Sequence, residues 1–330
     1  MAERPDVCIL CFDLRASGVV RNALRIAGAA QAAGLVTDLW LVRPEGSLRN
    51  EVPKGVRLRE AGLSVVPGNR SLALLCALPA MASYLRRTRP RIALSSGNHM
   101  HASVGLSWHL AGRPENVEIW ARASNSLLRH SLASVIGLPL STLTARLTDL
   151  LNSLQYKSFA HVIAVSRELG TALVQDLGVD PARSMIIANG VDASAIAMQA
   201  AEPVNHHWFG EGTPPVILAV GRLTSQKNFE DLVEALPRVR QSIAARLLIL
   251  GEGTTRRRAA LVDRAARLGV ADAVLLPGFE ANPYKFLARA SVVAVSSRWE
   301  GSSNVVLEAL ACGTPVVAYG CPTGIAETIT

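Results

Sequence analysis

Short apolar runs rich in β-branched residues alternate with amphipathic stretches along the first part of the chain. Residues 7–12 and 37–42 have the length and composition of buried strands, and residues 19–33 repeat their apolar positions with the period of a helix. The other expected strands are 92–95, 117–121, 161–165 and 185–188, and the other expected helices are 72–87 and 167–176. This alternation predicts βαβ units around a parallel sheet that is buried on both faces.

A second alternating series starts at residue 216. Its expected strands are 216–220, 247–250, 274–276, 292–295 and 316–318, and its expected helices are 229–240, 255–268, 283–290 and 305–311. The segment 193–213 has no period and contains Pro203 and two adjacent histidines, so we expect a linker there. The sequence therefore predicts an α/β protein of two tandem, doubly wound Rossmann-like domains, 1–192 and 214–330, that face a cleft at the carboxyl ends of their sheets.

The composition excludes two broad classes of protein. Apolar residues make up 49% of the chain and charged residues 18%, which excludes a disordered chain. The net charge of +8 suggests a nucleic-acid partner, but only 5% of the residues are aromatic and the basic residues form no tail or recognised motif. We therefore expect no nucleic-acid partner.

Positive charge is concentrated in the first half of the sequence. Residues 1–180 carry a net charge of +7, and residues 181–330 carry +1. Contact with an anionic membrane surface and an ordinary solvated surface both explain this excess. The arginines concerned are Arg86, Arg87, Arg89 and Arg91 after the apolar stretch 72–85, and Arg15, Arg21 and Arg25 near the first helix.

The five cysteines indicate a reducing compartment, because their number is odd and their spacing does not fit a disulfide framework. Cys8 and Cys11 form a C-x-x-C inside a predicted strand, where they would point to opposite faces. We therefore expect them to pack in the core rather than to bind a metal or exchange electrons. No secretory signal is visible, so the expected location is cytoplasmic. Because of the positive charge of the first half, the protein is also expected to contact the inner face of the cytoplasmic membrane peripherally.

One strand-to-helix junction of the second series combines glycine with two cations. Gly221 opens a tight turn that has Arg222 near its start and Lys227 at its end, directly before the expected helix 229–240. A guanidinium, an ammonium and free helix N–H groups together suit a diphosphate. A surface arginine and lysine would give the same local pattern.

A further junction follows the expected strand 292–295. Glu300 stands in the loop, and Glu308 lies in the next helix among apolar residues, where an unpaired carboxylate is costly. Residues 301–304 would offer consecutive N–H groups at the start of that helix. The two carboxylates suit the hydroxyl groups of a sugar and of a ribose.

Taken in order, these motifs resemble a known enzyme family. Residues 221–227, 251–253, 282–284 and 300–317 are similar to the retaining glycosyltransferases of family 4, which adopt the GT-B fold and include bacterial enzymes of surface-polysaccharide synthesis. The resemblance is dense over residues 216–327 and looser but continuous before them. Family members continue past the Glu327 region through a further strand and long helices, whereas this sequence stops at Thr330, so the second domain is expected to be incomplete relative to the family.

The resemblance implies roles for residues of the second domain. Arg222 and Lys227 match the cations that hold the diphosphate of the donor. Glu300 matches a residue beside the transferred sugar, and Glu308 matches a residue on the ribose. The other donor-binding positions that the resemblance implies are Gly221, Gly278, Phe279, Ser302, Ser303, Asn304 and Val305.

Fewer residues of the first domain match the family. Gly18 matches the glycine that lets the first strand-to-helix loop approach the phosphates. His99 matches a catalytic histidine that contacts the donor sugar near the reacting carbon. His101, Arg122 and Asn125 are the candidates on the acceptor side.

The resemblance implies retaining transfer of a sugar from a nucleotide-diphosphate sugar, with UDP preferred to GDP, to a glycan or a lipid-linked acceptor. Cations and helix-start N–H groups would stabilise the departing diphosphate, so no cofactor and no metal is expected. Two alternatives remain open: a sugar-nucleotide epimerase of the same fold, and a non-catalytic fragment that only binds the nucleotide sugar.

Overall fold

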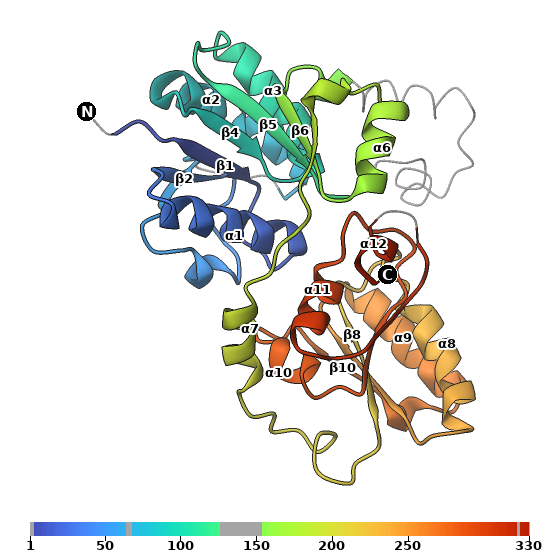
Figure 1. The fold of residues 1–330 in the computed structure, drawn as a ribbon. Helices are drawn as coiled ribbons and strands as arrows, with labels where there is room; N and C mark the ends of the chain where they lie inside the picture. Colours follow the sequence, from blue (N-terminus) through green and yellow to red (C-terminus); the bar gives the residue numbers. More distant parts are fainter. Residues whose placement is uncertain (1–2, 64–67, 126–153, 322–323, 330) are drawn as a thin grey trace. The chain divides into compact units, whose positions relative to one another are not determined.

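The computed structural model of the chain describes residues 3–63, 68–125, 154–321 and 324–329. The chain divides into two compact units, Met1–Ala188 and Asn189–Thr330. Each unit has its own parallel sheet with helices packed on it (Figure 1). The predicted α/β class and the two Rossmann-like domains are confirmed.

The sheet of the first unit has the strand order β3-β2-β1-β4-β5-β6-β7, in which the order reverses beside β1. Its strands are β1 (Val7–Cys11), β2 (Thr37–Leu41), β3 (Arg57–Glu60), β4 (Ile92–Ser95), β5 (Glu118–Ala123), β6 (His161–Ala164) and β7 (Ser184–Ile186). Its helices are α1 (Gly18–Ala32), α2 (Arg70–Thr88), α3 (His101–Leu110) and α6 (Arg167–Gln175).

Alternate residues of β1 pack into two different hydrophobic layers. Cys8 and Leu10 lie in the layer that contains the buried residues of α2, α3 and α6. Ile9 and Cys11 lie in the layer that contains the buried residues of α1. The two cysteines therefore point to opposite faces, as predicted, and burial raises the pKa of Cys11 to about 12, which leaves it a packed thiol.

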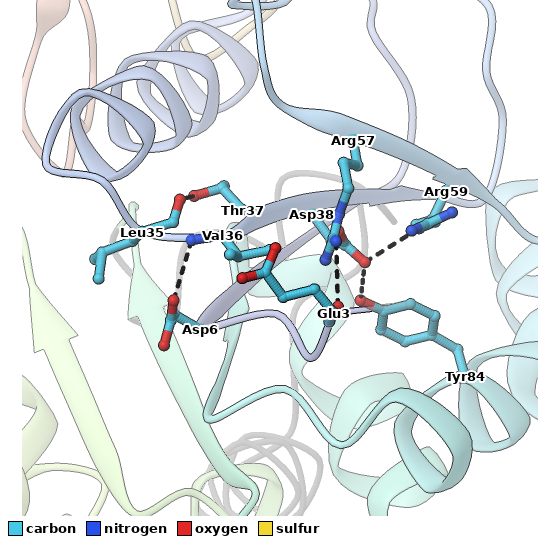
Figure 2. A network of polar contacts seen from close by, with 9 residues as sticks. All are labelled: Glu3, Asp6, Leu35, Val36, Thr37, Asp38, Arg57, Arg59 and Tyr84. Atoms are coloured by element: carbon cyan, nitrogen blue, oxygen red, sulfur yellow. Dashed lines mark hydrogen bonds and ion pairs between the residues drawn. The ribbon is translucent and has the colours of Figure 1, made fainter. Parts of the chain in front are cut away.

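An edge strand that the hydrophobic pattern does not predict, β3, is held by charge. Figure 2 shows the carboxylate of Asp38 on β2, which is fully buried, accepting from Arg57 Nε at 2.6 Å and from Arg59 Nε at 3.1 Å. Tyr84 on α2 donates its hydroxyl to the same carboxylate at 2.8 Å, and burial, followed by Cys8 and Asp38, raises the pKa of Tyr84. Cross-strand ion pairs thus replace the apolar run that marks the other strands.

The sheet of the second unit has the order β10-β9-β8-β11-β12, which reverses beside β8. Its strands are β8 (Val216–Val220), β9 (Arg246–Leu250), β10 (Val274–Gly278), β11 (Val292–Val295) and β12 (Val316–Ala318). Its helices are α7 (Ala193–Ala200), α8 (Phe229–Arg240), α9 (Thr255–Arg267), α10 (Tyr284–Leu287), α11 (Asn304–Ala311) and α12 (Ala326–Ile329). Helices α8 and α9 form one layer with the sheet, and α7, α10 and α11 form the other.

The segment 193–213 is not a bare linker, which corrects the expectation from its sequence. It contains α7, which begins after Asp192, where the Asp192 carboxylate accepts from Ala195 N at 2.9 Å. Ile196 and Trp208 are buried in the core of the second unit, and the Arg246 guanidinium lies 5.2 Å from the centre of the Trp208 ring. Because Ile196 is the one buried position of this short helix, the sequence shows no helical period there.

The arginines that account for the positive charge of the first half do not form one basic face, because they lie at opposite edges of the first sheet. Arg86 and Arg87 are in the last turn of α2, which leads to the amino end of β4, whereas Arg21 is in the first turns of α1, which follows the carboxyl end of β1. Ion pairs join Arg15 to Asp13, Arg21 to Glu51 and Arg91 to Asp6. Among the helices of the described residues, none is both long enough and apolar enough to cross a membrane.

Candidate functional site

The reversal of strand order in the second unit brings two polar loops together. In open α/β sheets, ligands bind at the carboxyl ends of the strands where the order reverses. Here the reversal lies between β8 and β11. The loop 221–227 follows β8, and the loop that carries Glu300 follows β11.

Lys227 and Glu300 form an ion pair between these loops. Lys227 Nζ donates to Glu300 Oε1 at 2.5 Å, and Ser297 Oγ donates to the same oxygen at 2.7 Å. Glu300 is 7% exposed, so little water screens the pair. The structure therefore joins a residue expected on the diphosphate and a residue expected beside the sugar in one hydrogen-bonded network.

Side chains that the sequence did not mark fix the two loops against each other. Gln226 Nε2 donates to Trp299 O at 2.9 Å, and Arg298 N donates back to Gln226 O at 2.8 Å. Ser296 Oγ donates to Lys227 O at 2.9 Å. These bonds explain why Lys227 and Glu300 meet, and they run largely to backbone atoms, which leave no signature in a sequence.

Close backbone approach explains one glycine of the motif 251–253. Gly251 has a φ of +147°, and a Cβ there would lie 1.9 Å from Gly221 O. Only glycine allows this contact, because any side chain would collide with the backbone of the loop after β8. The glycine thus brings the loops after β8 and β9 together.

The start of α11 has hydrogen-bonding groups that the helix itself does not use. The first N–H groups of a helix have no acceptor within it, and the side chain of the N-cap residue Ser303 does not bond to them. Ser303 Oγ is buried and has no hydrogen-bond partner among the described residues. Asn189 Nδ2 donates to Asn304 Oδ1 at 2.8 Å, which holds the first residue of the helix.

The other residues expected at this site lie around the same carboxyl edge. Arg222 is exposed, and no ion pair joins it to any described residue. Glu308 is buried on α11. Gly278 ends β10 with a φ of +104°, and Phe279 after it is 39% exposed. Ser302 and Val305 are half-buried on either side of the helix start.

In the first unit, the reversal lies between β1 and β4, and His99 is on the loop after β4. His99 is exposed, and its ring meets the Phe12 ring edge-on, with 6.1 Å between the ring centres. Gly18 is the exposed first residue of α1, directly after Ser17, whose hydroxyl accepts from Val20 N at 3.3 Å. Both residues therefore lie at the carboxyl edge where the sequence placed them.

Two of the acceptor-side candidates are enclosed, which corrects the expectation that they face an acceptor. His101 is fully buried against Tyr156 and Phe159, with Ser95 Oγ 2.7 Å from its Nδ1, and burial lowers its pKa to about 3. Arg122 is 4% exposed, and burial lowers its pKa to about 10. Both follow from the fold, since His101 opens α3 on its inner side and Arg122 lies within β5.

The third candidate, Asn125, is half-buried and is held through its backbone. Asn98 Nδ2 donates to Asn125 O at 3.0 Å, while Asn98 Oδ1 accepts from Ser124 N at 2.9 Å. Asn98 therefore ties the loop after β4 to the loop after β5. Nothing in the sequence marks Asn98, because a single asparagine beside a glycine is common in any loop.

Family models match both halves of the chain. The model described as Glycosyltransferase Family 4 matches residues 16–195, more than half of the chain. The chain belongs to glycosyltransferase family 4. A second model, Glycosyl transferases group 1, matches residues 214–330 of this family 4 chain.

Curated relatives of this family 4 chain are similar over part of their length. The N-acetylgalactosamine-N,N'-diacetylbacillosaminyl-diphospho-undecaprenol 4-alpha-N-acetylgalactosaminyltransferase of Campylobacter jejuni is 35% identical over 155 residues, which are 47% of this chain and 40% of the relative. The lipopolysaccharide core biosynthesis glycosyltransferase LpsE of Rhizobium meliloti is 38% identical over 104 residues, 32% of this chain and 29% of the relative. The matches thus span less than half of the length of these relatives.

Solved structures confirm the GT-B fold. Anabaena Alr3699/HepE, in complex with UDP and glucose, matches with a TM-score of 0.74 and 18% identity over 98% of this chain and 82% of that one. WaaG, a glycosyltransferase involved in lipopolysaccharide biosynthesis, matches with a TM-score of 0.71 and 17% identity over 98% and 83%.

Proposed function

We propose that this family 4 chain transfers a sugar from a UDP-sugar to a glycan or lipid-linked acceptor in the synthesis of a cell-surface polysaccharide, with retention of configuration. The observation that carries the proposal is the network of Glu300, Lys227 and Ser297 at the carboxyl edge of the second sheet. It adjoins the start of a helix whose N-cap hydroxyl, on Ser303, has no partner among the described residues. A carboxylate beside a cation and helix-start donors suits a sugar that is attached to a diphosphate.

In this proposal each charged group has a separate role. The exposed Arg222 and the half-buried Lys227 hold the diphosphate. When the donor binds, Lys227, which donates to Glu300 in the ligand-free protein, also donates to a phosphate oxygen. Glu300 then accepts from a hydroxyl of the transferred sugar, and Glu308 accepts from the ribose. Cations and helix N–H groups stabilise the departing diphosphate without a metal ion, and the leaving phosphate takes the proton of the attacking acceptor hydroxyl.

The relatives favour this function over the two alternatives. The named relatives described above are glycosyltransferases, and the Anabaena protein was solved with UDP and glucose, which supports a UDP-sugar donor. The Campylobacter relative is named for a diphospho-undecaprenol substrate, which supports a lipid-linked acceptor. A sugar-nucleotide epimerase and a purely nucleotide-binding fragment have no comparable support.

A donor screen tests the proposed function. Thermal unfolding is measured with UDP-, GDP- and ADP-sugars, and a ligand at 100 times its Kd stabilises the protein by about 2.7 kcal/mol. We expect UDP-sugars to give the largest shift and Arg222→Ala and Lys227→Ala to reduce it. Lys285→Ala is the matched control, because Lys285 pairs with Glu280 away from this network. Unchanged shifts in the Arg222 and Lys227 variants would contradict the assignment.

A lipid-linked acceptor also leads us to propose peripheral contact with an anionic membrane through the layer of α2 and α3. Leu72 and Leu75 on α2 are 51% and 60% exposed, and Leu106 and Leu110 on α3 are also exposed. Arg86 and Arg87 on α2 add positive charge to this layer. Sedimentation with anionic vesicles at low salt should pull down the wild type and less of a Leu75→Glu variant. Equal binding to neutral vesicles would exclude electrostatic docking.

A further inference from the structure

Residues 324–329 of the second unit pack against the loop that carries Glu300. They follow β12, which pairs with β11, so the two segments that leave these strands are neighbours. A Cβ on Gly324 would overlap Gly301 O and lie 3.1 Å from the Cα of Ser302. Gly324 also has a φ of +82°, in the left-handed region that favours glycine. The backbone of Gly324 thus lies directly against the two residues that follow Glu300.

Contacts within the second unit hold Gly324 in this position. Ile325 is 2% exposed and belongs to the hydrophobic core that contains Val306 of α11. Thr328 Oγ1 donates to Gly324 O at 3.0 Å, and Thr328 N donates to Ile325 O at 3.0 Å. Because a packed side chain and a helical turn fix Gly324, a Cβ at this position would displace the Glu300 loop rather than the segment 324–329.

Hydrogen bonds to the loop after β8 fix the same loop just before Glu300. Gln226 Nε2 donates to Trp299 O at 2.9 Å, and Arg298 N donates to Gln226 O at 2.8 Å. Glu300 therefore lies between a stretch that is bonded to the loop after β8 and a stretch that abuts Gly324. The position of its carboxylate depends on both contacts, and a displacement of about 1 Å in a reacting group is enough to slow catalysis about 100-fold.

We propose that Gly324 is a positioning residue for the transfer reaction. Its lack of a side chain lets the segment 324–329 support the backbone at Gly301, and this support sets where the Glu300 carboxylate meets the transferred sugar. The proposal rests on the proposed function, in which Glu300 accepts from a hydroxyl of that sugar. Gly324 acts through the Glu300 loop and takes no part in bond breaking.

Steady-state kinetics and UDP titration of two alanine variants test the proposal. Gly313, just after α11, has a φ of +73° and would place a Cβ in open space, so Gly313→Ala causes similar backbone strain without the contact. Gly324→Ala should lower kcat for UDP-sugar turnover by about tenfold or more and leave the Kd for UDP nearly unchanged. Gly313→Ala should keep both values of the wild type. Equal kcat values in the two variants, or a loss of UDP affinity as large as the loss of kcat, would overturn the proposal.

A spectroscopic readout tests the same contact without turnover. Trp299 directly precedes Glu300 and is one of five tryptophans in the chain. Labelling with fluorotryptophan gives Trp299 a fluorine resonance, which a Trp299→Phe variant identifies. Gly324→Ala should shift this resonance and Gly313→Ala should not. An unshifted Trp299 resonance in Gly324→Ala would overturn the proposal.

A milder pair of variants keeps the test decisive if Gly324→Ala does not fold. Thr328→Val removes the bond to Gly324 O and adds no atom beside Gly301, so kcat should fall by about threefold to fivefold at unchanged UDP affinity. Thr314→Val is the matched control, because it removes a hydroxyl bond to Leu287 O in the same unit and should leave kcat unchanged. Equal kcat values in these two variants would overturn the proposal. A wild type without UDP-sugar turnover would instead contradict the proposed function, and the fluorine resonance would still test the contact.

Discussion

Asp38 in the first unit and Glu300 in the second are both buried carboxylates that accept hydrogen bonds from a cation and from a hydroxyl group. Asp38 is near the amino end of β2, opposite Arg57 of the neighbouring strand, and Tyr84 reaches it from the end of α2 (Figure 2). Glu300 instead lies past the carboxyl end of β11, before the uncapped start of α11.

This difference shows that burial and ion pairing alone do not identify a ligand site. Both carboxylates have them, but the Asp38 network joins two strands and a helix, whereas the Glu300 network joins two loops at the reversal of strand order. A carboxylate between strands stabilises the fold, and one between loops at the carboxyl edge is available to a ligand. We therefore expect substitutions of Asp38 to change stability and substitutions of Glu300 to change catalysis.

The largest expected effect is on stability, in an Asp38→Asn variant. The amide accepts less strongly than a carboxylate and leaves two partly buried guanidiniums without a counter-charge, so the free energy of unfolding should fall by about 3 kcal/mol. Chemical denaturation measures this loss. Glu60→Gln on the neighbouring strand β3, which removes the exposed ion pair of Glu60 with Arg49, should lower stability by less than about 1 kcal/mol. Equal losses of stability in the two variants would contradict the role of Asp38 in stabilising the fold.

A Glu300→Gln variant tests the expectation that Glu300 serves catalysis. The substitution keeps the shape of the side chain but removes the charge beside Lys227, and kcat for UDP-sugar turnover should fall by about 100-fold. The Kd for UDP should change little, because the sugar rather than the nucleotide contacts Glu300 in the proposed function. Steady-state kinetics and UDP titration measure the two effects. An equal loss of UDP affinity would show that Glu300 serves the nucleotide.

His101 extends the comparison to a buried group that is uncharged. Burial lowers its pKa to about 3, whereas the unfolded chain takes up a proton near pH 6.5. Between these values the unfolded state binds more protons, so this contribution to stability is present above pH 6.5 and is lost as the pH falls towards 3.

A His101→Gln variant should therefore lose less stability than the wild type between pH 7 and pH 5, by about 2 kcal/mol. Denaturation at several pH values measures both slopes, and the comparison of slopes is independent of any loss that the substitution causes at neutral pH. Parallel slopes would mean that the pKa of His101 is not lowered in the folded protein.

Ser303→Ala should have the smallest effect. The variant should be at least as stable as the wild type but should bind the UDP-sugar more weakly. A buried hydroxyl without a partner carries a desolvation cost, so its removal should leave the ligand-free protein equally stable or more stable by up to about 1 kcal/mol. Affinity for the UDP-sugar should fall by a similar amount, because the hydroxyl then has no bond to offer the donor. Lower stability with unchanged affinity would make Ser303 a structural residue.

Apolar strands were the part of the fold that the sequence predicted best. The boundaries of β8, β11 and β12 agree with the predicted ones, since each is a continuous apolar run. Helix α3 was missed because it buries His101 and Ser107 while Leu106 and Leu110 are exposed, which inverts the usual pattern. Strand β3 was missed because ion pairs rather than apolar residues hold it.

The sequence predicted those parts of the candidate site in which the backbone or the ligand requires a particular residue type. Glycines and cations at strand ends marked the loop 221–227 and the segment 300–308, but nothing in them showed that Lys227 and Glu300 pair with each other. The contact of Gly324 with Gly301 joins the segments that follow β12 and β11, and each glycine taken alone resembles an ordinary turn residue. Such contacts become visible only once the strand order is known.

Calorimetric titration with UDP of the wild type, Asp38→Asn and Lys227→Met tests the central claim most directly, namely that the network at the carboxyl edge of the second sheet is the donor site. The wild type and folded Asp38→Asn should bind UDP with the same Kd, and Lys227→Met should bind at least about tenfold more weakly, as expected for the loss of a charged hydrogen bond. Equal affinity in all three proteins, or no binding by the wild type, would contradict the account.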